Sequence, residues 1–346
     1  MLSKLPSSAK SEPLARTPAF ISSRSINGWS IDQALRRLGH SGEGWCFFTE
    51  ESSLLSALQD RGARYRFKPQ MRDDLIDDKW RFCCWLRDIG ERPIPSALSL
   101  DSSLHYPIVL KSRHSWKHGS KLPRGWVCAN EADVLERLKD FDRLALQKDW
   151  FFFQEYLSGE TLNVSVSGYY DAKRPHRTLT MTTVKVVGSD RALPTGVVVE
   201  VIADPAGLTE RTLNILRQLE YDGPFEMEFL RCSGGEFFVL ELNPRFWMQH
   251  ALFTEFAANG LVKRYLDLDG EKDWQMRTLS DHVVWINSIE VLQRVVRGSF
   301  GILRTILSYR ERGARLFFVP SWRVASRHVA NRIFRKLGLQ ASLDLF

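Results

Sequence analysis

The sequence predicts an α+β fold built from antiparallel hairpins and packed helices. Residues 162–170 and 178–187 alternate between apolar and polar side chains in the period of a strand. Residues 208–219 place apolar side chains at helical spacing, and residues 225–245 form two alternating runs around a glycine pair. Because strands and helices follow one another in mixed order, we expect hairpins in a layered α+β fold.

Composition limits the classes of protein that the chain can belong to. It has 346 residues, of which 44% are hydrophobic and 26% are charged, which suffices for one large domain or two to three small ones. No stretch approaches the roughly 20 consecutive apolar residues of a spanning helix, so we expect no integral membrane protein. The 5 cysteines, without a CxxC spacing, give little support to a zinc ribbon or a disulfide framework. They indicate a reducing compartment, and we expect a cytoplasmic protein.

The N-terminal part is expected to be a tail followed by a short layer. Residues 1–28 are rich in Ser, Pro and Arg and lack the apolar core of a signal sequence, which is typical of a disordered tail. Residues 29–72 show helix patterns at 31–38 and 51–61 and strand patterns at 45–48 and 64–67. This is an abbreviated α/β layer, too short for a complete nucleotide-binding domain.

A central domain is predicted at residues 73–278. Asp77 and Asp78 are good N-cap residues for a helix that Gly90 ends. The following prolines force an extended segment, and residues 106–111 form a strand that carries Lys111 at its end. Further strands are expected at 126–129, 150–157 and 197–202, and a helix at 131–139.

The most informative stretch is FEMEFLRCSGGEFFVLELNPR, residues 225–245. If Gly234 and Gly235 form a two-residue turn, Glu228 lies opposite Glu241 and Glu226 lies opposite Asn243. All four side chains then project from one face, because side chains alternate along a strand. The other face is apolar and consists of Phe225, Met227, Phe229, Leu240 and Leu242.

This polar face is a candidate metal site. Like charges placed directly opposite one another destabilise a sheet, so the pattern indicates that a cation lies between them. Two carboxylates and an amide suit Mg²⁺ or Mn²⁺ rather than zinc. We predict Glu228, Glu241 and Asn243 as metal ligands, with Arg245 on the same face to meet an anion. The alternative is the solvated polar face of an ordinary hairpin.

Glu228 followed by Glu241-Leu242-Asn243-Pro244-Arg245 resembles the metal-binding end of the ATP-grasp superfamily. Three further blocks occur in the family's order, and the resemblance covers about residues 75–270. They are the Asp78-Lys79 helix start with Gly90 and its prolines, the strand 107–111, and QEYLSGE at 154–160. The resemblance implies an ATP-grasp fold in which two α+β lobes clasp ATP, with the abbreviated layer before it and a helical segment after it.

The resemblance also implies a role for each residue, with ATP and Mg²⁺ (or Mn²⁺) as cofactors. Lys79 and Lys111 would neutralise the phosphates. Arg245 and Lys185 would stabilise charge on the transferred γ-phosphoryl group. Glu160 would bind the ribose hydroxyls. The residues that would hold the adenine by backbone hydrogen bonds and an apolar wall are Gln154, Glu155, Tyr156 and Leu157.

The implied activity is that of a carboxylate–amine ligase. Such an enzyme phosphorylates a carboxylate to an acyl phosphate, which an amine or similar nucleophile attacks, giving ADP and phosphate. Its partners would be a small-molecule carboxylate and amine. The loop after Lys111 is poor in glycine, and Arg113 and Lys117 could contact phosphate in place of backbone amides. This loop and the short N-terminal layer leave the alternative of an ATP-binding regulator without ligase turnover.

The C-terminal segment, residues 279–346, is expected to be helical and basic. From residue 291 onward it has eleven Arg or Lys residues and two acidic ones. We expect a helix at 284–296 on the core and a basic amphipathic pattern at 321–337. Such a pattern predicts weak contact with an anionic membrane surface or an acidic partner, or else a helical cap with solvated arginines. Aromatic and basic residues do not interleave, so nucleic acid is not an expected partner. The sequence does not indicate an oligomeric state.

Overall fold

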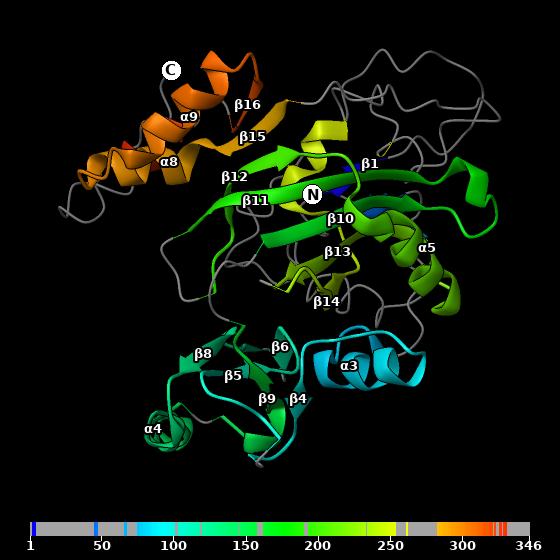
Figure 1. Cartoon of the computed structure of the whole chain (residues 1–346), viewed down its shortest axis with the longest axis vertical. Coiled ribbons are helices and arrows are strands. Elements are labelled where there is room, and N and C mark those ends of the chain that lie inside the picture. The colour runs from blue at the N-terminus through cyan, green and yellow to red at the C-terminus, as the bar shows by residue number, and fades with distance from the viewer. Residues whose placement is uncertain are drawn as a thin grey trace.

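The structure is a computed structural model of the chain (Figure 1). It describes residues 75–100, 103–117, 120–144, 146–157, 162–189, 193–232, 234–253, 261, 282–320, 322, 325–326 and 328–330, with backbone only at 116–117, 120–121 and 142. It also describes the backbone of three short strands nearer the N-terminus. None of the described helices combines the length and the apolar character needed to cross a membrane.

The smaller of two main sheets has four antiparallel strands in the order β4-β9-β5-β8. These are β4 (Ser96–Ala97), β9 (Phe151–Glu155), β5 (Ile108–Ser112) and β8 (Gly125–Cys128). Helix α4 (Glu131–Arg143) packs on the sheet through Val134 and Phe141. A two-stranded hairpin, β6 (Trp116–Lys117) and β7 (Ser120–Lys121), follows β5 in the segment that leads to β8.

The larger sheet has seven strands in the order β14-β13-β10-β11-β12-β15-β16. All neighbours are antiparallel except β15 and β16. The strands are β10 (Leu162–Tyr170), β11 (Leu179–Gly188), β12 (Gly196–Val201), β13 (Gly223–Arg231), β14 (Phe237–Asn243), β15 (Val283–Asn287) and β16 (Arg315–Val319).

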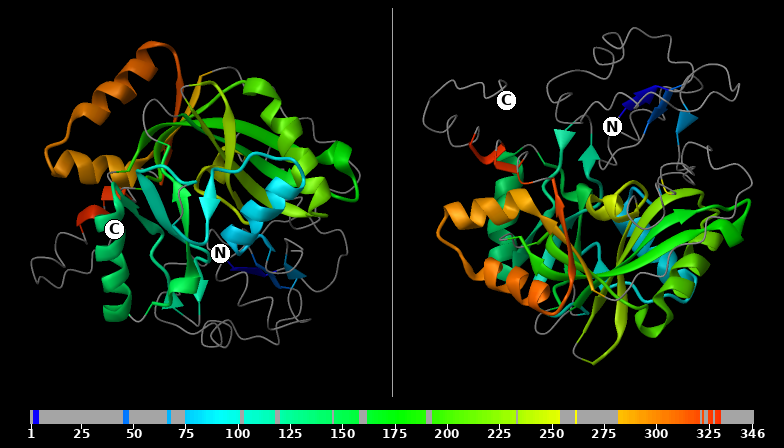
Figure 2. Two further views of the ribbon diagram at one scale, coloured as in Figure 1. Left: turned by 60° about the horizontal axis from the view of Figure 1, so that its bottom comes forward. Right: turned by 90° about the horizontal axis from the view of Figure 1, so that it is seen from above.

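Helices cover one face of this sheet. Helix α5 (Leu208–Gln218) and helix α3 (Lys79–Asp88) share a core with the apolar side chains of β10, β13 and β14. Helices α8 (Ser288–Val296) and α9 (Gly301–Glu311) pack on β12, β15 and β16, and their hairpin lies at the outer edge of the molecule (Figure 2). The polar side chains of β13 and β14 therefore project from the opposite face, toward the smaller sheet.

Three short strands near the N-terminus form a separate sheet in the order β1-β2-β3. Strands β2 (Trp45–Phe47) and β3 (Arg66–Phe67) confirm the predicted strand patterns there. Strand β1 (Leu2–Lys4), within the segment predicted as a disordered tail, pairs with β2, and the rest of that segment lies outside the described residues. The helix patterns predicted at 31–38 and 51–61 lie outside the described residues.

The helix predicted at 284–296 is wrong in its first turn. Residues Val283–Asn287 form β15, which pairs with β12 on one side and β16 on the other. The run Val-Val-Trp-Ile suits a strand, since branched and aromatic side chains pack well on a pleated surface. Asn287 then caps α8 by accepting a hydrogen bond from the Glu290 amide, at 3.2 Å. The segment from residue 279 is therefore not purely helical.

Candidate active site

The β13–β14 hairpin brings the predicted polar residues together. Glu226 pairs with Asn243 and Glu228 pairs with Glu241, as the sequence predicts. The turn itself differs from the prediction. The Cys232 amide donates to the Glu236 carbonyl at 3.0 Å, so three residues rather than two separate the paired ends.

A β-bulge restores the predicted pairing near the site. Phe229 pairs with Val239 while Glu228 pairs with Glu241, which leaves Leu240 as the extra residue of β14. Val239, not Leu240, is therefore the fully buried partner of Phe229 on the apolar face. The longer turn shifts the register by one residue and the bulge shifts it back, so Glu241 and Asn243 keep their predicted places.

Asn243 lies at the centre of a polar cluster on this face. Its Nδ2 donates to Glu226 Oε2 and to Glu228 Oε1, each at 3.1 Å. Its Oδ1 accepts a hydrogen bond from Arg245 Nη2 at 3.1 Å. The asparagine thus holds two carboxylates and a guanidinium in fixed positions.

Glu228 also contacts the neighbouring strands of the large sheet. Its Oε2 accepts a hydrogen bond from Asn163 Nδ2 at 3.2 Å and lies 3.8 Å from Lys185 Nζ. Lys185 Nζ donates as well to the Pro194 carbonyl, at 3.2 Å. Asn163 Oδ1 is buried and has no hydrogen-bond partner in the described part of the chain. An unpaired buried oxygen beside a carboxylate is suited to meet a cation or a donor group of a ligand.

Lys111 reaches the acidic face from the smaller sheet. Its Nζ lies 3.8 Å from Glu241 Oε2 and donates to Gln154 Oε1 at 3.2 Å. Gln154 is 2% exposed, and its Nε2 donates to Ser96 Oγ at 3.1 Å. The Gln154 side chain therefore supports Lys111 from within the smaller sheet, and the Lys111–Glu241 ion pair joins the two sheets.

Lys79, the first residue of α3, is the second lysine on this side. It is half-buried, and its Nζ donates to Ser115 Oγ at 3.5 Å. Burial lowers the pKa of Lys79, and the nearby Glu241 carboxylate partly offsets that effect.

The carboxylates of the cluster differ in electrostatic character. Burial and the Glu228 carboxylate raise the pKa of Glu226 to about 8. Burial also acts to raise the pKa of Glu241, but Lys111 and then Lys79 outweigh it and lower that pKa to about 2. Arg124 and Arg245 act on Glu241 in the same direction.

Positive charge is in excess at this site. Among the described residues, its cations are Lys79, Lys111, Arg124, Lys185 and Arg245, and its carboxylates are Asp77, Glu226, Glu228 and Glu241. An excess of fixed cations in a partly buried site favours a polyanionic ligand.

The predicted metal ligands fit a cation that a ligand helps to hold. Among the described residues, no three His, Cys, Asp or Glu side chains form a cage for an ion. Mg²⁺ usually takes only one or two carboxylates and completes its shell with water and substrate phosphates. Glu228 and Glu241 lie on one face and supply hard oxygen atoms, and the unpartnered Oδ1 of Asn163 belongs to a side chain that bonds Glu228. Asn243 lies on the same face, with its Oδ1 accepting from Arg245. This donor set suits such an ion.

The segment predicted to hold an adenine is partly engaged with the protein itself. The amides of Glu155 and Tyr156 donate to the carbonyls of Pro95 and Pro107, each at 2.9 Å. The Glu155 carboxylate binds His105 and accepts from its amide at 3.0 Å. Leu157 is the last described residue of this segment, and Glu160 lies outside the described residues.

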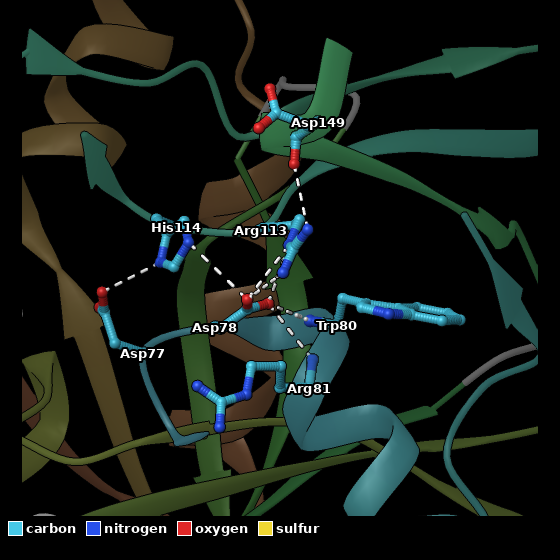
Figure 3. Close-up of polar contacts among 7 residues, drawn as sticks. All are labelled: Asp77, Asp78, Trp80, Arg81, Arg113, His114 and Asp149. Atoms are coloured by element: carbon cyan, nitrogen blue, oxygen red, sulfur yellow. Dashed lines mark hydrogen bonds and ion pairs between the residues drawn. The ribbon is translucent and has the colours of Figure 1, made fainter. Parts of the chain in front are cut away.

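Arg113 does not lie free for phosphate. Its guanidinium forms a fork with the Asp78 carboxylate, in which Nε lies 3.1 Å from each oxygen (Figure 3). The structure thus shows Arg113 engaged with Asp78, and contact of this arginine with phosphate in place of backbone amides stays a prediction. The side chain of Lys117 is not described.

Arg124, Asn163 and the charge coupling of Glu226 are the parts of the site that the sequence analysis did not assign. Arg124 precedes Gly125, which pairs with Lys111, so its place beside Glu241 follows from a strand pairing that the sequence does not show. Asn163 lies at the start of a predicted alternating strand and could have been noticed as a polar residue on its inner face.

No protein-family model and no curated protein sequence matches the chain. Solved structures do match its fold. Biotin carboxylase from Campylobacter jejuni, in complex with βγ-ATP, aligns with a TM-score of 0.50 and 15% identity over 66% of this chain and 53% of the other. An N5-carboxyaminoimidazole synthase from Aspergillus clavatus aligns with a TM-score of 0.47 and 14% identity over 64% and 60%.

The Staphylococcus aureus N5-carboxyaminoimidazole synthetase gives a TM-score of 0.47 and 15% identity over 67% of this chain and 60% of the other. In the match to the Campylobacter biotin carboxylase, the chain spans about half of that protein's length. At these identities the likeness concerns the fold. The match to the Campylobacter biotin carboxylase, together with the contact of Lys111 in the smaller sheet with Glu241 in the large sheet, shows that the chain has the ATP-grasp fold.

Proposed function

We propose that the chain is an ATP-dependent ligase that joins a carboxylate to an amine or a similar nucleophile. The observation that carries the proposal is the 3.8 Å contact of Lys111 with Glu241, which sets the lysine proposed to bind phosphate on one lobe against the carboxylate proposed to bind the metal on the other. The surplus of cations at the site supports a polyphosphate ligand.

The nucleotide would lie between the two sheets. Lys79 and Lys111 neutralise its phosphates as point charges from the side of the smaller sheet. Because the amides of Glu155 and Tyr156 already donate to Pro95 and Pro107, we propose the Leu157 amide as the donor to the adenine. Glu160 keeps its proposed role at the ribose.

Glu228, Glu241 and Asn243 would hold Mg²⁺ (or Mn²⁺), which would supply positive charge to offset that of the phosphates. Asn163 would orient Glu228, since its Nδ2 already donates to that carboxylate. Asn243 is itself oriented by Arg245.

Arg245 and Lys185 would stabilise the γ-phosphoryl group during transfer. A carboxylate oxygen of the substrate attacks the γ-phosphorus, the bond to the β-phosphate oxygen breaks, and ADP leaves. The amine then attacks the acyl carbon, phosphate leaves with the bonding electrons, and the amine nitrogen loses a proton. Fixed cations speed such a transfer mainly by positioning and electrostatics.

ADP release tests this proposal against the alternative of an ATP-binding regulator. The full chain is incubated with ATP, Mg²⁺ and pairs drawn from a panel of carboxylates, including bicarbonate, and amines. We expect ADP to form several-fold faster with at least one pair than with ATP alone. Tight ATP binding without stimulation by any member of the panel would favour the regulator.

We also propose partners and a location. The substrates are a small carboxylate and a small amine, and the compartment is the cytoplasm, which the free thiols of the described cysteines support. At the far edge, Val296, Phe300 and Leu307 are 59%, 58% and 53% exposed. Exposed Arg297 and Arg304 lie among them, which suits weak contact with an anionic membrane surface.

A further inference from the structure

The Asp78 carboxylate at the start of α3 is buried and surrounded by donors (Figure 3). It accepts hydrogen bonds from the amides of Trp80 and Arg81, at 3.0 and 3.2 Å, and so caps the helix. The Arg113 guanidinium meets the same carboxylate through a two-pronged ion pair. Although burial opposes it, these bonds hold the pKa of Asp78 below its ordinary value.

Arg113 connects this carboxylate to two other segments. Its carbonyl accepts a hydrogen bond from the Lys79 amide at 2.8 Å, and its amide donates to the Trp150 carbonyl at 2.8 Å. Its Nη1 donates to the Asp149 carbonyl at 3.2 Å. The main chain and the side chain of Arg113 therefore join the first turn of α3, the end of β5 and the start of β9.

Capping alone does not require this ion pair. A neutral Asn or Ser caps a helix about as well as Asp. A buried ion pair is also weak evidence for stability, because desolvation of the two charges offsets much of their attraction. What the fork adds is a defined geometry, since planar guanidinium and carboxylate groups meet in few orientations.

This connection lies between the two lysines that are proposed to bind the phosphates. Lys79 follows Asp78 directly. Lys111 lies on β5, two residues before Arg113. Two like charges placed near each other repel, so they need a rigid frame to bind one polyphosphate together. The fork lies on the short path between the backbones that carry them.

We propose that Arg113 is a positioning residue for nucleotide binding, which fixes Lys79 relative to Lys111 through its ion pair with Asp78. This inference rests on the proposed function, because it assumes that both lysines bind the phosphates of ATP. His114 completes the frame, with its Nδ1 3.2 Å from Asp77 Oδ2 and its Nε2 3.8 Å from Asp78 Oδ2.

The chain offers a matched control at the other end of α3. Arg211 Nε forms an ion pair with Glu91 at 2.6 Å, and the two side chains are 22% and 13% exposed, against 23% and 4% for Arg113 and Asp78. Removal of Arg211 releases the end of the helix that is far from Lys79. A merely structural role would give the Arg113 and Arg211 variants the same phenotype.

The test is a double-mutant cycle on nucleotide affinity, measured by calorimetry on the full chain with ATP and with adenosine. We expect Arg113→Ala to weaken ATP about tenfold and adenosine less than about twofold, since a misplaced lysine loses a charged contact. In a Lys79→Ala background, Arg113→Ala should add less than about twofold, because the lysine that it positions is gone. Arg211→Ala should leave ATP affinity unchanged.

Asp78→Asn separates capping from the ion pair, and carries the test if Arg113→Ala does not fold. Asparagine keeps the cap but cannot form the charged fork, so ATP should weaken as in Arg113→Ala. Additive effects of Arg113→Ala and Lys79→Ala, equal losses for ATP and adenosine, or an equal loss in Arg211→Ala would overturn the inference. Absence of ATP binding by the unaltered chain would instead overturn the proposed function, and this inference with it.

Discussion

At the scale of single residues, two carboxyl groups on one face are tuned in opposite directions. Glu226 is buried near the Glu228 carboxylate and has a raised pKa, whereas Glu241 faces Lys111 and Lys79 and has a lowered one. The sequence shows both as glutamates of an alternating strand. Their difference comes from residues of other strands and of α3, so it can be seen only when the sheets are assembled.

Lys111 gives the first prediction. Replacement by methionine keeps most of the length of the side chain but removes the charge, and should weaken ATP at least about tenfold and adenosine by less than about twofold. Calorimetric titration with both ligands measures this. Equal losses for the two ligands would show that the substitution disturbs the fold or that Lys111 has another role.

Glu226 gives a prediction for pH dependence. A carboxyl whose pKa is raised on folding binds a proton that the unfolded chain releases, so its contribution to stability falls as pH rises from about 4.5 toward 8. Burial, Glu228 and Glu241 raise this pKa, and Arg245 and Lys185 oppose them. In the presence of a chelator, Glu226→Gln should therefore raise the melting temperature by several degrees at pH 8 and by much less at pH 5.

Glu210→Gln, at an exposed glutamate of α5, is the control for that measurement. The difference between pH 5 and pH 8 should be much larger for Glu226→Gln than for this variant. A gain in Glu226→Gln that is the same at both pH values would contradict the assignment of a raised pKa.

At the scale of elements, the β13–β14 hairpin departs from a simple two-residue hairpin in two ways that cancel in the register. Its turn is one residue longer, and a β-bulge adds Leu240 to β14. The Gly235 amide donates to the Cys232 carbonyl at 2.8 Å, and Gly235 has a φ of 83°, which disfavours any side chain. Gly234 has no such positive φ, and a Cβ added to it would meet no atom within 4 Å. The two neighbouring glycines therefore have different roles.

This difference is measurable by chemical denaturation. Gly235→Ala should lower the free energy of unfolding by about 1 kcal/mol, because alanine is strained at a positive φ. Gly234→Ala should change it by less than about half of that amount, and nucleotide affinity should be unchanged in both. Equal losses in the two variants would contradict the described turn.

The elements also show which features of the fold the sequence patterns predict and which they do not. Alternation correctly placed β10 and the pairing of Glu228 with Glu241, and Asp78 correctly marked the start of α3. The run before Ser288 was ambiguous, since a short apolar segment fits a helix or a buried strand until its neighbours are known. The sequence pattern does not reveal the bulge at Leu240, because an apolar residue can lie on either face of that strand.

Arg113 shows a different limit. An arginine after a strand that is proposed to bind phosphate is chemically suited to phosphate, and its sequence position does not reveal its ion pair with Asp78. Long-range ion pairs depend on tertiary contacts, so only the assembled fold assigned this one.

At the scale of the whole molecule, the polar face of β13 and β14 and the exposed arginines of the α8–α9 hairpin lie in different parts of the structure. The hairpin of α8 and α9 forms the outer edge of the molecule (Figure 2). Strands β15 and β16 belong to the large sheet, so a truncation near Ser288 would remove β16 and disturb the core. Point substitutions on the hairpin are the sound test of its proposed membrane contact.

The combined change of Val296 and Phe300 to serine should reduce binding to vesicles of phosphatidylglycerol and phosphatidylcholine several-fold, as measured by co-sedimentation. Binding of the unaltered chain should fall at high salt, because arginines supply part of the attraction. Leu135→Ser, at a residue of α4 that is 53% exposed, is the control and should change nothing. Equal binding to vesicles of phosphatidylcholine alone, or no effect of the serine variant, would contradict the proposal.

The most direct test of the two-lobed site is ADP formation by Glu241→Gln as Mg²⁺ is titrated. The substitution keeps the shape of the side chain and removes the charge that faces Lys111, so we expect Mg²⁺-dependent turnover to fall by at least about a hundredfold while circular dichroism shows an intact fold. Turnover of the variant at the rate of the unaltered chain, with the same dependence on Mg²⁺, would contradict the assignment of Glu241 and the clasp of ATP between the two sheets.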